Sequence, residues 1–441
     1  MRLCLTFLMM TLSISIGYCQ LGFQMETNKN KFVIPFQLIN NLIFIPITVN
    51  GEELTFLLDT GVEQTVLFSL DDKEDVSFFN VKKIKLKGLG SSDAIEALKS
   101  SNNRLKVKEF VDNSHDIYII LNQEFNFSSQ VGIPVNGIIG YHFFKNHLVE
   151  INYIQKKIIV YKNHKKIRKR LQKSFFSENI SLENNKPYLI SQITFREKSI
   201  PSKMLLDTGN SDGLWVFRNS QNAITLPDYV ISDYLGRGFS GNVYGERGRI
   251  TALKFGNTSF KKPIATFPDS TSTKDVVMVE DRIGSLGGEV LKRFSIVFDY
   301  NNNKMYSKPN TLLNEPFNYN MSGIEVQHEG LEWVKGNYTE NPTLSDNLFD
   351  NRGEKINNNL KFKFELKPVF TIYTVRVASP AEKAGLLKGD KILKINHTEA
   401  HSFSLEKINQ LLKSEEGKTI EMELERNKKI LKIKFQLKNV L

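Results

Sequence analysis

The chain has 441 residues and a formal net charge of +11, and 40% of its residues are apolar and 24% are charged. These values are ordinary for a soluble globular protein of two to four domains, each large enough to bury a core. The positive charge is spread out apart from one basic cluster at residues 165–170, which we interpret as a solvated linker and not as a polyanion-binding patch. No nucleic-acid motif accompanies this cluster, so we expect no nucleic-acid partner.

Residues 1–19 predict a signal peptide. Arg2 gives a positive start, residues 3–16 form an apolar run too short to span a bilayer comfortably, and small residues stand where a signal peptidase reads the chain before Gln20. No later stretch is apolar enough for a transmembrane span. We therefore expect a mature protein that begins at Gln20 and is exported to the periplasm or the extracellular space.

Both cysteines, Cys4 and Cys19, lie within this signal, so the mature chain would contain none. Their absence excludes a disulfide framework, a thiol nucleophile and a cysteine-based zinc site, and for an exported protein it favours a bacterial source. The histidines show no metal-ligand spacing, and we expect His142 and His147 to be solvated. We therefore expect no metal and no other cofactor.

The first β-rich region, residues 31–163, opens with predicted strands at 32–36 and 42–49. Apolar runs that end in Asn or Gly turns indicate mostly β structure. Asn50-Gly51 predicts a hairpin turn into the next strand. That strand ends in Asp59-Thr60-Gly61, which places a carboxylate, a hydroxyl and a glycine directly after a buried apolar run.

The same triplet recurs as Asp207-Thr208-Gly209 in a second region, residues 185–309. Gly140 follows Asp59 by 81 residues and Gly287 follows Asp207 by 80, and a similar strand–turn–strand pattern follows each glycine. We interpret the two regions as an internal duplication of about 130 residues. One Asp-Thr-Gly could be an ordinary turn, but two copies in matching surroundings predict two half-sites that meet.

These two regions resemble the lobes of retropepsin-like and pepsin-like aspartic proteases. The resemblance rests on the two triplets and on the glycine elements Ile138-Ile139-Gly140 and Ser285-Leu286-Gly287. It implies a mainly β fold, in which two duplicated lobes form one cleft and Asp59 and Asp207 share a water molecule.

The resemblance also assigns roles around the two aspartates. Carboxylates this close cannot both ionise, so the pair would hold one proton. The ionised member would take a proton from the attacking water and the protonated member would support the oxyanion. Thr60 and Thr208 would brace the loops, and Gly61 and Gly209 would allow tight turns.

Three neighbours of the triplets complete these expectations. Val62 stands where the family usually has a small residue. Glu63 and Asp212 are expected to be exposed turn residues.

Each lobe has a glycine-rich segment that could form a flap over the cleft, as in the family. The flap candidates are Gly88 and Gly90 in the first lobe and Gly238 and Gly241 in the second. The second segment contains a G-x-G-x-x-G string, but no helical pattern follows it, so we reject a dinucleotide-binding loop. Glycines tolerate positive φ and close substrate approach, which favours a mobile hairpin.

The last region, residues 320–441, resembles a bacterial PDZ domain in the string from Ser379 to Asn396. The family binds peptides by strand addition beside a helix. Candidate groove residues are Gly323 and Ile324, in a possible carboxylate-binding loop, and Leu405 and Ile408 on an amphipathic helix. Residues 310–360 are rich in Asn, Glu and Gly, and we expect them to be partly irregular.

The resulting hypothesis is an exported aspartic endopeptidase that acts on polypeptides, with a PDZ domain that recruits or regulates substrate through a peptide ligand. The alternative is a non-catalytic peptide-binding protein whose lobes serve as scaffold and whose aspartates are merely hydrogen-bonded turn residues. A scaffold would require neither aspartate, and both Asp59 and Asp207 are present. The sequence therefore favours the peptidase.

Overall fold

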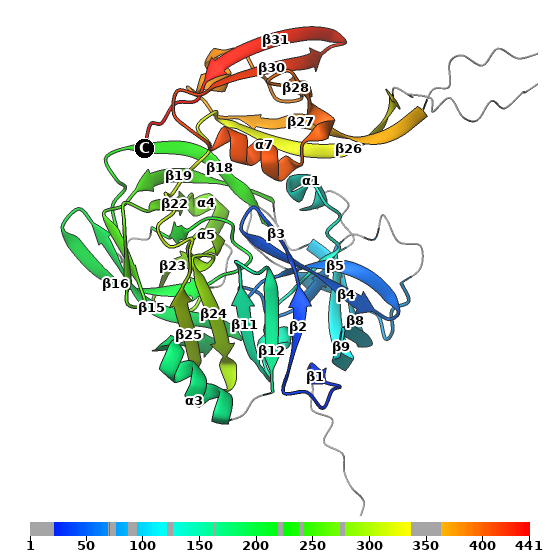
Figure 1. Cartoon of the computed structure of the whole chain (residues 1–441), viewed down its shortest axis with the longest axis vertical. Helices are drawn as coiled ribbons and strands as arrows, with labels where there is room; N and C mark the ends of the chain where they lie inside the picture. Colours follow the sequence, from blue (N-terminus) through cyan, green and yellow to red (C-terminus); the bar gives the residue numbers. More distant parts are fainter. Residues whose placement is uncertain are drawn as a thin grey trace, which may run out of the picture.

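The computed structural model describes residues 22–68, 70, 76–86, 95–120, 127–162, 165–218, 224–238, 241–273, 278–336 and 363–441. The predicted signal peptide at 1–19 lies outside these ranges. Strands dominate throughout the described chain, which confirms the predicted mainly β fold (Figure 1).

The first lobe is built on a sheet that has nine strands in the described residues, in the order β1-β9-β6-β10-β5-β4-β8-β7 with β3 paired to β4. Its strands are β1 (Gln24–Met25), β3 (Gln37–Ile39), β4 (Leu42–Val49), β5 (Glu52–Leu58), β6 (Thr65–Leu67), β7 (Lys82–Leu86), β8 (Ile95–Val107), β9 (Phe110–Ile120) and β10 (Gly137–Ile139). Asn50 (φ 51°) and Gly51 (φ 111°) form the predicted hairpin turn, because both central residues of such a turn need positive φ. The short strand β10 lies parallel to β5 and antiparallel to β6, which brings Gly140 beside the Asp59 loop.

The second lobe repeats this arrangement. Its sheet, ten-stranded over the described part, has the order β18-β19-β22-β17-β23-β16-β15-β20-β21, with β14 paired to β15. Its strands are β14 (Ser181–Glu183), β15 (Lys186–Phe195), β16 (Lys198–Leu206), β17 (Leu214–Val216), β18 (Val230–Gly238), β19 (Gly241–Arg249), β20 (Ala252–Phe255), β21 (Thr258–Lys261), β22 (Ile264–Pro268) and β23 (Arg282–Leu286). Strand β23 lies parallel to β16 and antiparallel to β17, as β10 does between β5 and β6.

A third sheet joins the lobes. In the described chain it has six strands in the order β13-β25-β24-β11-β12-β2, namely β13 (Phe176–Asn179), β25 (Lys304–Pro309), β24 (Phe294–Asp299), β11 (Leu148–Asn152), β12 (Lys157–Tyr161) and β2 (Lys31–Pro35). The lobes meet where β11 pairs antiparallel with β24. Two short helical turns, α2 (Tyr141–Phe144) and α5 (Gly288–Leu291), lead from the lobe sheets into this sheet. The turn η1 (Tyr300–Asn302) joins β24 to β25, and α4 (Ser270–Thr273) lies between β22 and β23 of the second lobe.

The basic cluster at residues 165–170 is not a simple solvated linker. It forms most of helix α3 (Lys165–Ser174), which buries Ile167 and Leu171 against the joining sheet. Arg168 Nε lies 2.7 Å from Asp299 Oδ2. The sequence did not predict this helix because only two of its residues, Ile167 and Leu171, are buried, and the residues around them are mostly charged.

The C-terminal region forms a separate sheet above the lobes (Figure 1). Its order is β26-β27-β28-β30-β31 with β29 on β28, from strands β26 (Ile324–Gly336), β27 (Lys363–Val375), β28 (Lys391–Ile395), β29 (Thr398–Glu399), β30 (Thr419–Arg426) and β31 (Lys429–Gln436). The helices are α6 (Pro380–Lys383), η2 (Ala400–Ser402) and α7 (Leu405–Leu412), and Ser404 caps α7 by accepting a hydrogen bond from Lys407 N. Residues 310–323 are irregular, in line with the expectation of partly irregular structure at 310–360, whereas β26 forms a long ladder with β27 that the sequence did not predict.

The expectation of solvated histidines is also wrong in the first lobe. His142 and His147 are both half-buried. Burial, together with the positive charges of His115 and Lys145, lowers the pKa of His142 to about 4.

Among the described residues, no group of His, Cys, Asp and Glu is arranged to hold a metal ion. Within that same part of the chain, no helix has the length and apolar character needed to cross a membrane.

Candidate active site

Asp59 and Asp207 lie on two equivalent loops. Asp59 follows β5, which pairs in parallel with β10, and Asp207 follows β16, which pairs in parallel with β23. Gly61 N donates a hydrogen bond to Asp59 Oδ1 (2.7 Å), and Gly209 N donates to Asp207 Oδ1 (3.2 Å). Each carboxyl also faces the glycine of the other lobe, since a Cβ on Gly209 would lie 2.2 Å from Asp59 Oδ2 and one on Gly61 would lie 2.8 Å from Asp207 Oδ1. Glycine is therefore required at both positions, and the two half-sites meet.

Two threonines lock the loops together across the lobe boundary. Thr60 Oγ1 donates to Leu206 O (2.6 Å) and accepts from Thr208 N (3.0 Å). Thr208 Oγ1 donates to Leu58 O (2.8 Å) and accepts from Thr60 N (3.0 Å). Because each hydroxyl bonds only to the opposite loop, these four bonds fix the separation of the two aspartates.

Both carboxyl groups are poor acids in this setting. Burial and then repulsion by the Asp207 carboxylate raise the pKa of Asp59 well above its ordinary value. Burial also raises the pKa of Asp207, although the positive charge of Arg282 opposes it. Two carboxyls that are each held against the loop of the other cannot both ionise easily, so the pair is expected to hold one proton.

The aspartates line a cavity of about 590 Å³ that is bounded by both lobes and by the C-terminal region. The first lobe supplies a mostly apolar wall, made of Leu42, Leu57, Val62, Val66, Ile120, Phe127, Val131 and Ile138. The second lobe supplies the charged residues Lys186, Asp212, Arg237, Arg247 and Arg282. The C-terminal region supplies Asn320, Glu325, Val326, Gln327, Tyr373, Asn409 and Lys413.

The glycine-rich hairpin of the second lobe, β18–β19, borders this cavity. Gly238 lies in the cavity wall, and Gly241 pairs with it at the end of the hairpin with φ 129°. The first-lobe flap candidates Gly88 and Gly90 lie outside the described residues.

The expectation that Glu63 and Asp212 are exposed turn residues is wrong for both. Glu63 is half-buried and accepts a hydrogen bond from Asn185 Nδ2 of the other lobe (2.8 Å). Asp212 accepts from Trp215 Nε1 (2.8 Å) and pairs with Arg247 Nη1 (2.7 Å). Burial opposes ionisation of Asp212, but Arg247 lowers its pKa below the ordinary value.

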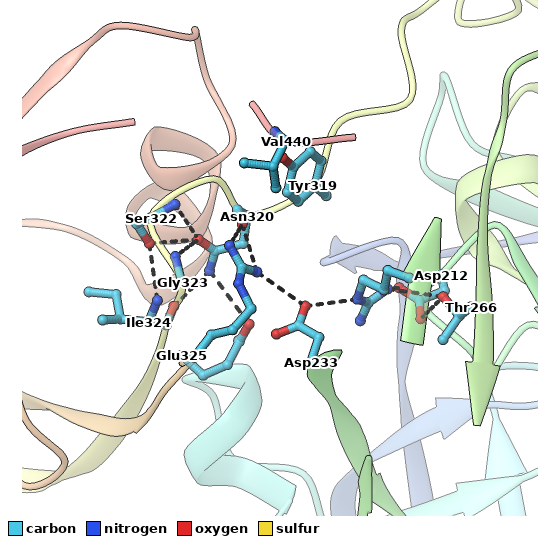
Figure 2. A network of polar contacts seen from close by, with 12 residues as sticks. Asp212, Asp233, Thr266, Tyr319, Asn320, Ser322, Gly323, Ile324, Glu325 and Val440 are labelled. Atoms are coloured by element: carbon cyan, nitrogen blue, oxygen red, sulfur yellow. Dashed lines mark hydrogen bonds and ion pairs between the residues drawn. The ribbon is translucent and has the colours of Figure 1, made fainter. Parts of the chain in front are cut away.

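This pair begins a chain of charges that runs from the second lobe into the C-terminal region. Asp233 Oδ2 accepts from Arg247 Nε (3.0 Å) and lies 3.5 Å from Arg376 Nη1. The Arg376 guanidinium in turn donates to Asn320 O. Figure 2 shows Asp233 between Asp212 on one side and Asn320 on the other. The C-terminal region is therefore tied to the wall of the cavity.

The candidate peptide groove of the C-terminal region is partly filled from within. Asn320 Oδ1 accepts from Ser322 N (3.1 Å) and Gly323 N (3.3 Å), which are loop donors that a bound carboxylate would use (Figure 2). Ile324, Leu405 and Ile408 are buried core residues. Gly132, directly after the first-lobe helix α1 (Phe127–Val131), lies against the start of α7, since a Cβ on Gly132 would lie 2.9 Å from Leu405 Cβ.

Sequence families agree with both parts of this architecture. The family model described as aspartyl protease matches residues 45–143, and the model described as PDZ domain matches residues 353–437. The chain carries an aspartyl protease domain and a C-terminal PDZ domain. No curated protein matches it. Among solved structures, an aspartic proteinase from Irpex lacteus is 11% identical with a TM-score of 0.41, and the match covers 65% of this chain and 100% of that one.

The protease-domain match ends before the second triplet, so the second half-site rests on the repeated geometry described above. Several cavity residues of that lobe escaped prediction, above all Lys186, Arg247 and Arg282. The chain has 59 Lys and Arg residues, and no spacing distinguishes these three. Their charges became informative only when the fold placed them beside the aspartates.

Proposed function

We propose that the protein is an aspartic-type endopeptidase. The observation that carries the proposal is the pair of carboxyls, one from each lobe and each held against the glycine of the other lobe, in the wall of a cavity of about 590 Å³. Their raised pKa values allow the pair to hold one proton over a broad acidic range. A merely structural pair of turn aspartates would not need to share a cavity wall.

The proposed reaction assigns different roles to the two carboxyls. Arg282 favours the ionised form of Asp207, so Asp207 takes a proton from water as the water oxygen attacks the peptide carbonyl carbon. Asp59 gives its proton to the carbonyl oxygen. Asp207 then passes its proton to the amide nitrogen, the C–N bond breaks, and one hydroxyl proton of the tetrahedral intermediate returns to Asp59.

We propose that the PDZ domain acts on substrate at the cleft itself. Its residues Glu325, Val326, Gln327 and Tyr373 line the same cavity as the aspartates. Strand β26 is an edge strand in the described sheet, so a peptide can extend along it while the scissile bond lies at the dyad.

We also propose export through the signal peptide at 1–19. N-terminal sequencing of the mature protein tests this proposal, and we expect the mature chain to start at Gln20.

Substitution of the two aspartates tests the enzymatic proposal. Asp59→Asn and Asp207→Asn keep the side-chain shape but remove one acid, and each should lower the cleavage rate of a peptide library by roughly a thousandfold or more. The losses should not add, because either change removes the whole proton-transfer pair. Cleavage is measured from acidic to neutral pH, and circular dichroism verifies that both variants fold. If either variant cleaves at the wild-type rate, the proposal fails.

A further inference from the structure

The second-lobe wall of the cavity carries positive charges that the dyad chemistry does not require. Lys186 begins β15 and Arg282 begins β23, and both side chains line the cavity. Both also act electrostatically on Asp207, and Lys186 acts on Asp59 as well. The first-lobe wall has no lysine or arginine among the described lining residues.

Arg282 is held rigidly without using up its donors. Its Nε donates to Gly284 O (3.2 Å), its Nη2 donates to Ser285 Oγ (2.7 Å), and the guanidinium lies 5.0 Å from the centroid of the Phe217 ring. These two bonds occupy two of the five N–H groups of the guanidinium. No other described residue accepts a hydrogen bond from this guanidinium, so the remaining donors can serve a ligand in the cavity.

Lys186 and a third cation at this wall, Arg237, have side-chain donors without a partner among the described residues. In the described chain, the Lys186 ammonium forms neither a hydrogen bond nor an ion pair, although it is only partly exposed. Arg237 of the hairpin also lines the cavity, and its Nε is buried without a hydrogen-bond partner among the described residues. The hairpin residues Leu235 and Val243 pack on Phe217, the ring that supports Arg282, so these cations border one region.

The charges of the cavity do not balance. The described lining has five cations and five carboxyl groups, but the dyad holds one proton, which leaves an excess of positive charge. Asp212 is matched by Arg247, and Glu63 is hydrogen-bonded to Asn185 and Gln64. Burying unmatched cations in a cavity is costly unless a ligand supplies the missing negative charge.

We infer that Lys186, Arg282 and Arg237, which line the same cavity, form a subsite for a carboxylate of the peptide substrate next to the scissile bond. This inference rests on the proposed function, because it assigns a substrate class to the same cleft. The carboxylate belongs either to an Asp or Glu side chain or to the free C-terminus of the substrate. The apolar first-lobe wall would take the residues on the other side of the scissile bond.

The experiment measures binding and cleavage separately. Peptides that carry a non-cleavable reduced peptide bond are prepared with Glu or Gln on either side of that bond, and with a free or an amidated C-terminus. Their dissociation constants are measured for the wild type, Lys186→Met and Arg282→Lys. Lys198→Met, at an exposed position of the same lobe, is the control. The matching cleavable peptides give kcat and KM.

In one of these two comparisons, Glu against Gln or free against amidated C-terminus, the wild type should bind the acidic peptide roughly tenfold to a hundredfold more tightly than the neutral one. Hydrogen bonds to a charged group account for a difference of this size. The Glu/Gln arm and the acid/amide arm identify the source of the carboxylate. Lys186→Met should remove most of that preference and raise KM for the acidic peptide alone. Arg282→Lys, which keeps the charge, should retain part of it, and Lys198→Met should retain all of it.

Several results would overturn the subsite. One is equal binding of acidic and neutral peptides by the wild type, and another is a preference that survives in Lys186→Met. A third is a shift of the pH profile in Lys186→Met that is identical for acidic and neutral peptides, since the cations would then only tune the dyad. Cleavage without charge preference rejects the subsite and leaves the peptidase, whereas charge-selective binding without cleavage rejects the peptidase and leaves the subsite.

Discussion

The two lobes place the same loop at the centre of the cleft and different walls around it. Around the aspartates, the Asp-Thr-Gly turns, the cross-lobe threonine bonds and the inserted strands β10 and β23 correspond one to one. The walls differ, because the first lobe lines the cavity mainly with apolar side chains whereas the second lines it with Lys186, Arg237, Arg247 and Arg282. The duplication therefore preserves the paired loops in both halves, whereas the walls have diverged. Under the proposed function, an asymmetric cleft suits a peptide, which is itself asymmetric.

The strongest test of the symmetric part is to remove each threonine hydroxyl in turn. Thr60→Val and Thr208→Val each delete one donor and one acceptor in a buried position, so each should lower the free energy of unfolding by about 2 kcal/mol and kcat by roughly tenfold to a hundredfold. The two losses should be equal, because the bonds mirror one another. Denaturant titration and steady-state kinetics measure them.

The serine variants provide the matched control. Thr60→Ser and Thr208→Ser keep the hydroxyl and should retain most of the activity. Clearly unequal losses in the two valine variants would mean that the lobes do not share the support of the dyad evenly.

The asymmetric part of the cleft is tested at Asp233, which links Arg247 of the second lobe to Arg376 of the PDZ domain. Asp233→Asn would leave two guanidinium groups facing each other without the charge between them. We expect a loss of about 2 to 3 kcal/mol in the free energy of unfolding, together with lower activity on short peptides.

Asp228, which pairs with Arg196 at an exposed position of the same lobe, is the comparison. Asp228→Asn should change stability by less than about 0.5 kcal/mol, because exposed ion pairs contribute little. Similar effects at the two positions would show that the link to the PDZ domain is not part of the cleft's stability.

The smallest expected effect concerns pH at the same junction. Burial, followed by repulsion from Asp233, raises the pKa of Glu325 from its ordinary 4.5 to about 7. Lys413, Arg247 and Arg376 also face this carboxyl and oppose the shift. Because the folded state binds this proton more tightly than the unfolded chain, the stabilisation is complete below pH 4.5 and is lost as the pH rises to about 7.

Glu325→Gln cannot ionise, so it should lose less stability than the wild type between pH 4.5 and pH 8. We expect a difference of about 1 kcal/mol, since the side chain is partly exposed, measured by denaturant titration at both pH values. Glu416→Gln, at an exposed position of the PDZ domain, should behave as the wild type does. If Glu325→Gln shows the wild-type pH dependence, the carboxyl does not titrate at this junction.

The sequence could predict the features that repeat or that follow from local chemistry. Asn50-Gly51 specified a hairpin turn, and the two triplets with their distant glycines specified two matching half-sites. Other features depend on contacts between distant segments, and no local pattern encodes them. Asp212 looked like a turn residue because its partner Arg247 comes 35 residues later, and β26 was missed because its partner β27 lies beyond a polar insertion.

The pairing of β11 with β24 also has a consequence for the order in which the molecule is made. Synthesis completes the first lobe while β24 is still untranslated, so the outer edge of β11 has no partner on the growing chain. A strand edge in that state can pair with another copy, which makes this stage the one most exposed to misassembly. The second aspartate, Asp207, is followed by the joining strand β24 only at Phe294–Asp299. A chain that ends before β24 therefore lacks the strand that joins the second lobe to the first, so the paired site forms only after residue 299 of the 441 has been added.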